Sequence, residues 1–85
     1  MTGEPKIILH AYGAVGDVVA TGEHSIDGAA TVQALLDRLC VANAALQPLI
    51  DQPRFRVAVD QVIVEPGHAL AGGEEVALLS PVSGG

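Results

Sequence analysis

Residues Thr31–Asn43 read TVQALLDRLCVAN and predict an amphipathic helix. Apolar side chains recur every three or four positions and so form one stripe along an α-helix; they are Val32, Leu35, Leu36, Leu39 and Cys40. Thr31 suits the N-cap, because its hydroxyl can accept a hydrogen bond from a free N–H of the first turn. Asn43 suits the end of the helix. A helix this short is not stable alone in water, so we expect its apolar stripe to pack against a sheet.

The segments on either side of this helix are rich in β-branched and apolar side chains and are bounded by turn residues, which predicts β-strands. They are Lys6–Tyr12, Glu23–Asp27, Arg54–Val59, Val62–Val64 and Glu75–Leu79. Glu23–Asp27 is expected to pair with the first strand as a hairpin. In Arg54–Val59 apolar residues alternate cleanly, which predicts Phe55, Val57 and Val59 on one face.

The last predicted strand presents two leucines in succession. Strict alternation places Val76 and Leu78 on one face, and Ala77 and Leu79 on the other. Because one helix covers one face of a sheet, two interpretations stay open. Either one of these leucines is exposed as a docking contact, or loops partly bury both.

The connecting segments are expected to be loops and turns. Gly13–Asp17 interrupts the chain after the first strand, and Val18–Gly22 fits either a loop or a short helix. Ala44–Pro53 is a connector in which two prolines prevent a long helix, and Asp60-Gln61 forms a turn. The order strand, strand, helix, strand, strand, strand predicts an α+β roll. Its mixed sheet would have about five strands, with one main helix packed on one face.

The composition indicates one domain that acts on other proteins. The chain has 85 residues, 49% of them hydrophobic, which is enough for one core. Ten Asp and Glu residues against four Lys and Arg give a formal net charge of −6. Such a charge is repelled by phosphate backbones and anionic membranes, and an aromatic content of 2% leaves little to stack on bases. We therefore expect no nucleic-acid and no membrane partner.

The cysteine and histidines predict neither a disulfide nor a metal site. Cys40 is the single cysteine, so no disulfide can form within the chain. It lies on the apolar stripe of the helix and is predicted to be a core residue rather than a nucleophile or sulfur relay. His10, His24 and His68 lack the spacing of metal ligands, so we expect no metal and no bound cofactor. Neither a signal peptide nor a membrane span is recognisable, which predicts a soluble, cytoplasmic protein.

The sequence ends in Pro81-Val82-Ser83-Gly84-Gly85, directly after the last predicted strand. Two terminal glycines offer no side chain, so the reactive group is the α-carboxylate of Gly85. Glycine is also the narrowest and most flexible residue, which lets such an ending enter a narrow channel on a partner enzyme. We expect a folded domain at residues 1–79 and a flexible tail at 80–85, which spans roughly 20 Å when extended. No arrangement of nucleophile and base is visible elsewhere, and we expect no active site within the chain itself.

The chain resembles the MoaD/ThiS-type family of ubiquitin-like sulfur carriers, and within it the small subunit of molybdopterin synthase. The resemblance rests on residues 57–61, which read VAVDQ, and above all on residues 70–85, which read LAGGEEVALLSPVSGG. The chain length and the helix start at Thr31-Val32 also fit. The resemblance implies the β-grasp fold and a role as a sulfur carrier.

The resemblance also implies a mechanism. In this family an E1-like enzyme uses ATP to adenylate the C-terminal carboxylate, and sulfur then replaces AMP to give a thiocarboxylate. Gly85, preceded by Gly84, would carry the sulfur, and ATP would be used by the activating enzyme. The large subunit of molybdopterin synthase would bind the carrier and pass sulfur to a pterin precursor. We assign partner binding to the residues beside the glycines: Leu79, Pro81, Val82 and Ser83.

Several departures from the family pattern bear on which partners dock. Leu78-Leu79 stands where paired aromatics are common, Ser80-Pro81 where Pro-Pro is common, and Asp60 where asparagine is common. Gly13–Asp17 lacks the arginines that often follow the first strand. Two alternatives therefore remain. The chain could carry sulfur for thiamine thiazole, cysteine or tRNA thiolation, or it could be a ubiquitin-like protein modifier or binding module.

Overall fold

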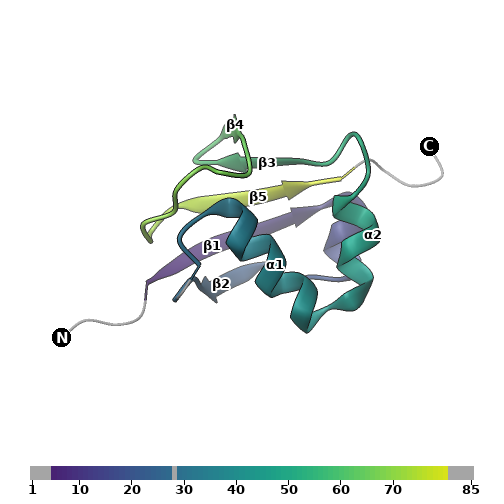
Figure 1. Ribbon diagram of the computed structural model, residues 1–85, viewed down its shortest axis with the longest axis horizontal. Helices are drawn as coiled ribbons and strands as arrows, with labels where there is room; N and C mark the ends of the chain where they lie inside the picture. Colours follow the sequence, from purple (N-terminus) through teal and green to yellow (C-terminus); the bar gives the residue numbers. More distant parts are fainter. Residues whose placement is uncertain (1–4, 28, 81–85) are drawn as a thin grey trace.

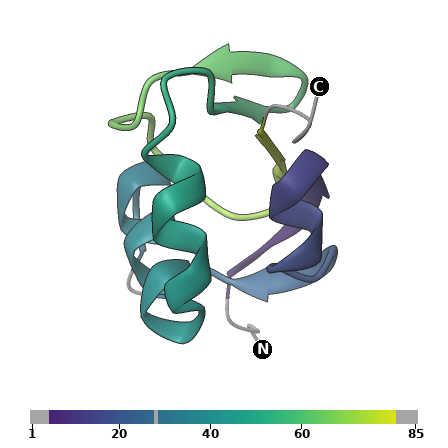
Figure 2. The ribbon, with the colours of Figure 1, turned by 90° about the vertical axis from the view of Figure 1, so that its right-hand side faces the viewer.

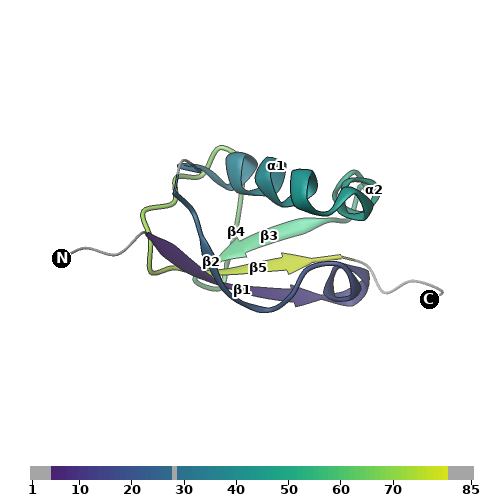
Figure 3. The same ribbon diagram turned by 90° about the horizontal axis from the view of Figure 1, so that it is seen from below.

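The computed structural model describes residues 5–27 and 29–80 of the chain. The strands are β1 (Lys6–Tyr12), β2 (Gly22–Ser25), β3 (Arg56–Val59), β4 (Val62–Val64) and β5 (Glu75–Leu79). The helices are α1 (Val32–Ala42) and α2 (Gln47–Ile50), with two short 3₁₀ helices, η1 (Gly13–Asp17) and η2 (Ala44–Leu46). In Figure 1 α1 crosses in front of the sheet, and Figure 3 shows α1 and α2 on the same side of it. No helix among the described residues is long and apolar enough to cross a membrane.

The sheet has the strand order β2-β1-β5-β3-β4. β1 and β5 are parallel, with Leu9 opposite Val76 and Tyr12 opposite Leu79. The other neighbouring strands are antiparallel. The first and last strands of the chain therefore lie side by side. The predicted α+β roll, a mixed sheet of five strands beside one main helix, is confirmed.

α1 begins at the predicted N-cap. Oγ1 of Thr31 accepts a hydrogen bond from the backbone N–H of Ala34 at 3.1 Å. The N–H of Val32 donates instead to the carbonyl of His68 at 3.0 Å, in the loop that precedes β5. Donors of the first helical turn, which have no partner within the helix, are thus satisfied by a side chain and by this loop. These bonds fix the start of α1 beside the sheet.

The core lies between the sheet and α1 and is aliphatic in the described residues. The larger aliphatic side chains of the predicted helical stripe are all buried, and Cys40 is half-buried against them. The largest fully buried side chains are Ile7, Leu9, Leu35, Leu46, Leu78, Val15, Val32 and Val76. No polar or charged residue is buried among the described residues. Apolar burial therefore supplies the main driving force for this fold.

Some boundaries differ from the sequence prediction. β2 covers Gly22–Ser25 rather than Glu23–Asp27, because its pairing with β1 starts at Gly22 and ends at Ser25. β3 begins at Arg56, so the predicted strand is too long by two residues at its start. The connector before it contains α2, a short helix with proline in its first turn, where no intrahelical N–H bond is lost.

The structure also shows the conformation of the two segments between β1 and β2. Gly13–Asp17 is the 3₁₀ helix η1, whose Val15 is fully buried. Val18–Gly22 contains no helix, which confirms the loop interpretation. The side chains of Val15 and Val19 both enter the core cluster. The connection between the first two strands is therefore held by apolar burial rather than left free.

The alternation predicted for β3 is confirmed, because Val57 and Val59 lie in the core cluster and Phe55 packs against it. Ala58 is 7% exposed although it lies outside the core cluster, on the opposite face from Val57 and Val59. Its cross-strand partners are Ala77 of β5 and Ile63 of β4. A small side chain between two neighbouring strands is covered by those neighbours, so it is buried without facing the core.

Candidate functional site

The predicted reactive and partner-binding residues of the tail lie outside the described residues; they are Pro81, Val82, Ser83, Gly84 and Gly85. The structure does describe the strand that leads to them. β5 is the middle strand of the sheet, parallel to β1 and antiparallel to β3. Two ladders of backbone hydrogen bonds hold such a strand. The tail therefore follows a strand that is paired along both of its edges.

Ser80 joins the end of β5 to the turn after β1. Its Oγ donates a hydrogen bond to the carbonyl of Tyr12 at 3.0 Å and accepts one from the N–H of Val15 at 3.1 Å. Its backbone N–H also donates to the carbonyl of Tyr12, at 3.4 Å. Figure 2 looks at this end of the molecule, where η1 in purple lies beside the end of β5. Nothing in the local sequence around Ser80 predicted these contacts, because their partners lie 65 and 68 residues away.

The face of the sheet turned away from α1 is called the outer face below. The register places these side chains on it: Ile8, His10 and Tyr12 of β1, Glu75, Ala77 and Leu79 of β5, Arg56 and Ala58 of β3, and Ile63 of β4. The charged residues Glu75 and Arg56 lie at opposite ends of β5. Tyr12 and Ile63 are 53% and 54% exposed, and the rings of His10 and Tyr12 stack with centroids 6.3 Å apart. Figure 3 shows α1 and α2 on the other side of the sheet. No described helix covers this surface.

The structure decides between the two leucines of β5. Leu78 is fully buried in the core, whereas Leu79 is half-buried on the outer face. Leu79 lies opposite Tyr12 of β1 and Arg56 of β3. The predicted alternation in β5 is confirmed, and its half-exposed leucine is Leu79, whose role in partner binding stays a prediction. Sequence reasoning missed Tyr12 as an outer-face residue, although the alternation of Ile8, His10 and Tyr12 carried the signal.

Glu74 holds the glycine turn that leads into β5. Its two carboxylate oxygens accept hydrogen bonds from the N–H groups of Ala71 at 2.9 Å and Gly72 at 2.7 Å. The bond from Ala71, followed by that from Gly72, lowers the pKa of Glu74 against the opposing effect of burial. At the same point, Oδ1 of Asp60 accepts a bond from the N–H of Glu75 at 3.0 Å. Side-chain to backbone bonds therefore fix the start of β5 as well as its end.

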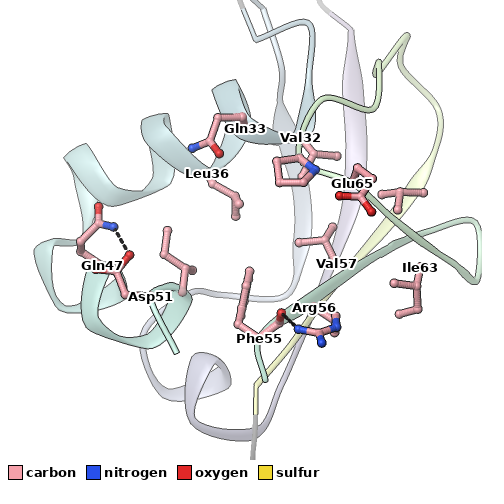
Figure 4. A pocket seen from close by; sticks show the side chains of 13 residues that line it. Val32, Gln33, Leu36, Gln47, Asp51, Phe55, Arg56, Val57, Ile63 and Glu65 are labelled. Carbon is pink, nitrogen blue, oxygen red and sulfur yellow. Dashed lines mark hydrogen bonds between the residues drawn. The ribbon is translucent and has the colours of Figure 1, made fainter. Parts of the chain in front are cut away.

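A groove of about 520 Å³ lies between α1, α2 and the β3–β4 edge (Figure 4). The amide of Gln47 donates to the carboxylate of Asp51 at 2.9 Å, and the guanidinium of Arg56 donates to the carbonyl of Pro53 at 2.8 Å. These polar groups are therefore already partnered within the protein. The described lining contains no serine, cysteine or histidine, so it lacks the usual pairing of a hydroxyl or thiol nucleophile with a histidine base.

Cys40 has the properties of a packing residue. It is half-buried against the core, and burial, followed by the charges of Asp37 and Asp51, raises its pKa. A raised pKa keeps the thiol protonated, which makes it a poor nucleophile. Its position agrees with the predicted core role. The described residues also include no group of three or more His, Cys, Asp or Glu side chains that could hold a metal ion.

The fold, together with the sequence that follows β5, defines the class of this protein. A mixed five-stranded sheet beside one main helix, with a Gly-Gly sequence after its central strand, is the architecture of a β-grasp, ubiquitin-like protein. The chain belongs to the ThiS family, whose model matches residues 15–85. This match confirms the predicted membership of the MoaD/ThiS-type carriers.

Solved structures of similar proteins support this assignment. The crystal structure of SAMP1 from Haloferax volcanii has 30% sequence identity and a TM-score of 0.76, covering 94% of this chain and 99% of that one. A crystal structure of H. volcanii small archaeal modifier protein 1 has 28% identity and a TM-score of 0.75, covering 94% and 100%. The solution structure of Urm1 from Trypanosoma brucei, at 22% identity and a TM-score of 0.68, covers all of both chains and is similar in fold. No curated protein matches significantly.

Proposed function

We propose that this protein is a sulfur carrier whose Gly85 carboxylate is adenylated and then converted to a thiocarboxylate. Membership of the ThiS family over residues 15–85 is the observation that carries the proposal. The described residues add support, because neither Cys40 nor the groove beside α2 offers reactive chemistry. The candidate we propose for this chemistry is the α-carboxylate of Gly85, whose ordinary pKa of about 3.3–3.7 leaves it ionised at neutral pH.

The proposed chemistry has two steps. The carboxylate of Gly85 attacks the α-phosphorus of ATP bound to an E1-like adenylating enzyme, which releases pyrophosphate and leaves an acyl-adenylate. A hydrosulfide ion (HS−) supplied through that enzyme then attacks the carbonyl carbon, expels AMP and loses its proton, which leaves the thiocarboxylate. Glycine at positions 84 and 85 leaves this carbonyl without steric hindrance. The carrier supplies the acyl group, and the partner enzyme supplies ATP.

The outer face is the surface we assign to docking. It is apolar at its centre, half-exposed at Leu79 and open to solvent at Tyr12 and Ile63. Apolar anchors within a polar rim are the usual composition of a protein interface. The formal charge of −6 favours a partner with a basic rim and accelerates the encounter. Partner binding would thus combine Leu79 on the outer face with Pro81, Val82 and Ser83 of the tail.

For the pathway we propose molybdopterin synthesis, in which the large subunit of molybdopterin synthase takes sulfur from Gly85. The resemblance of the ending Pro81-Val82-Ser83-Gly84-Gly85 to that small subunit supports this choice. A sulfur carrier for thiazole, cysteine or tRNA thiolation would use the same activation with a different acceptor. Co-purification with a pterin-synthase large subunit separates these pathways, because a carrier that serves a different acceptor would not bind that subunit.

A ubiquitin-like modifier is the second candidate. It is favoured by the similarity to a protein described as small archaeal modifier protein 1, at 28% identity over 94% of this chain. In this function the activated Gly85 carbonyl is attacked by a lysine amine of another protein, which gives an isopeptide bond. Immunoblots of lysates under denaturing and reducing conditions would show heavier adducts that disappear when Gly85 is deleted.

Intact mass spectrometry tests the activation itself. Protein co-expressed with an E1-like enzyme and a sulfur source is expected to gain the mass difference between one sulfur and one oxygen atom. Deletion of Gly85 is the matched control and should abolish the shift without lowering stability. Absence of the shift with every E1-like enzyme tried would refute the sulfur-carrier proposal.

A further inference from the structure

We propose that Ser80 is a positioning residue that fixes the point and direction from which the tail leaves the fold. The inference rests on the proposed function, because a fixed direction matters only where Gly85 is delivered to an enzyme. Alignment of a reacting group before the chemical step lowers the barrier to that step. A carrier that holds the start of its tail in place would contribute part of this alignment itself.

The hydroxyl of Ser80 both donates and accepts a hydrogen bond. Its hydrogen goes to the carbonyl of Tyr12 at 3.0 Å, and one of its lone pairs accepts the N–H of Val15 at 3.1 Å. Two bonds to different backbone groups specify the side-chain rotamer as well as its position. Val15 is itself fully buried in the core, so Ser80 is tied to a rigid part of the molecule.

Gly13 gives independent evidence for this contact. Its φ of +73° lies in the left-handed region that side chains disfavour. A Cβ at this position would lie 2.5 Å from the carbonyl oxygen of Ser80 and 2.8 Å from its Oγ. The backbone carbonyl cannot turn away as the end of a flexible side chain can. Glycine is thus required for two reasons, and the second of them is the close approach of Ser80.

Serine is suited to this position for a chemical reason. Alanine would lose both hydroxyl bonds, and proline would also lose the N–H that donates to the carbonyl of Tyr12 at 3.4 Å. Threonine would keep the hydroxyl. The contact lies beyond Leu79, whose side chain faces the outer face, so docking and presentation of the tail are separable by mutation.

Ser80→Ala is expected to lower the turnover number. Without the hydroxyl the backbone at Ser80 samples more conformations, and a smaller fraction of docked complexes presents Gly85 to the nucleotide. We expect kcat for adenylation to fall roughly 5–30-fold, which equals about 1–2 kcal/mol at 1.36 kcal/mol per tenfold change. KM should stay within about twofold, because the side chains assigned to docking, on the outer face and at positions 81–83, are all unchanged.

The test is steady-state ATP–pyrophosphate exchange by an E1-like enzyme with the full chain as substrate. Ser80→Thr is expected to restore kcat, and Gly13→Ala, which displaces Ser80 without removing its hydroxyl, should lower it. Ser25→Ala is the matched control, because its hydroxyl also bonds a backbone N–H, that of Asp27 at 3.2 Å, near the opposite end of β1. Amide hydrogen exchange provides a second readout, since loss of its acceptor should accelerate exchange at Val15 in Ser80→Ala.

The outcomes separate this inference from the proposed function. A lower kcat with constant KM in Ser80→Ala, rescue by Ser80→Thr and faster exchange at Val15 would support it. Wild-type turnover in Ser80→Ala, or an equal loss in Ser25→Ala, would overturn the positioning role and leave the sulfur-carrier proposal standing. Failure of the wild-type protein to be adenylated by any E1-like enzyme would overturn both.

Discussion

Leu78 and Leu79 are neighbours on β5 that face opposite sides of the sheet, so alanine at each position separates folding from partner binding. Leu78 is 0% exposed and lies opposite Val57 within the core. Leu78→Ala should lower the free energy of unfolding by about 3–5 kcal/mol, because a close-packed interior cannot fill the cavity. Leu79 is half-buried, so Leu79→Ala removes about half of a leucine's burial energy, roughly 1 kcal/mol.

Urea unfolding and calorimetric titration measure the two effects. In a domain of this size, 1 kcal/mol shifts Tm by roughly 4–8 °C, so Leu78→Ala should melt more than about 12 °C below the wild type. Leu79→Ala should bind the E1-like enzyme about tenfold more weakly, which is typical of an interface residue that contributes more than 1 kcal/mol. Leu78→Ala, measured where it is folded, should keep wild-type affinity. Val41→Ala is the matched control, because Val41 is 88% exposed on α1, away from the outer face.

Two results would refute this reasoning. Equal destabilisation by Leu78→Ala and Leu79→Ala would mean that Leu79 also belongs to the core, which contradicts the assignment of the two faces. Unchanged affinity in Leu79→Ala, or an equal loss in Val41→Ala, would mean that the outer face is not the docking surface. The first result tests the assignment of the two faces and the second tests the docking surface, so each can be interpreted without the other.

Three further predictions concern the frame around the site. Thr31→Ala removes the cap bond to Ala34 and should lower the free energy of unfolding by about 1 kcal/mol in urea titrations; no change would show that the cap is dispensable. Glu74 has a lowered pKa, so it stabilises the fold above its ordinary pKa of 4.5 and loses this contribution as the pH falls through the lowered value. Stability measured between neutral pH and pH of about 3 should therefore fall less steeply in Glu74→Gln, and identical slopes would contradict the assignment. Gln61 has a φ of +72° in the turn between β3 and β4, so Gln61→Gly should raise Tm by a few degrees, whereas a lower Tm would show that its side chain is needed.

The elements of the fold could be predicted because their signals are local. The apolar stripe of α1 and its cap at Thr31 are contained in about a dozen residues, and the structure places both as expected. The parallel pairing of β1 with β5 could not be deduced in this way, since strand order depends on how distant segments pack. Even where alternation placed the faces of β3 correctly, it did not predict that Ala58 is buried, because that burial comes from Ala77 and Ile63 on other strands.

The candidate site likewise combines a feature that is local in the sequence with contacts between distant residues. The predicted reactive ending rests on Gly84 and Gly85 alone, because two successive glycines without side chains are a property of the sequence. The support for that ending was not readable, because Ser80 contacts Tyr12 and Val15 across 68 and 65 residues. A signal was present in Gly13 at the end of the first strand. A glycine there indicates a tight turn or a close approach, but it does not name the approaching residue.

The position of Leu79 next to Ser80 limits where a partner can hold its active site. Leu79 belongs to the outer face and Ser80 is fixed to η1, so the docking contact and the start of the tail are one residue apart. Five residues beyond Ser80 span at most roughly 17 Å when fully extended. A partner that binds the outer face must therefore place its reactive atom within about that distance of the end of β5. Insertion of two glycines after Ser80 should lower turnover more than affinity, because the outer face keeps its contacts while the added length enlarges the volume that the carboxylate samples. Unchanged turnover after the insertion would show that the partner's channel alone guides the tail.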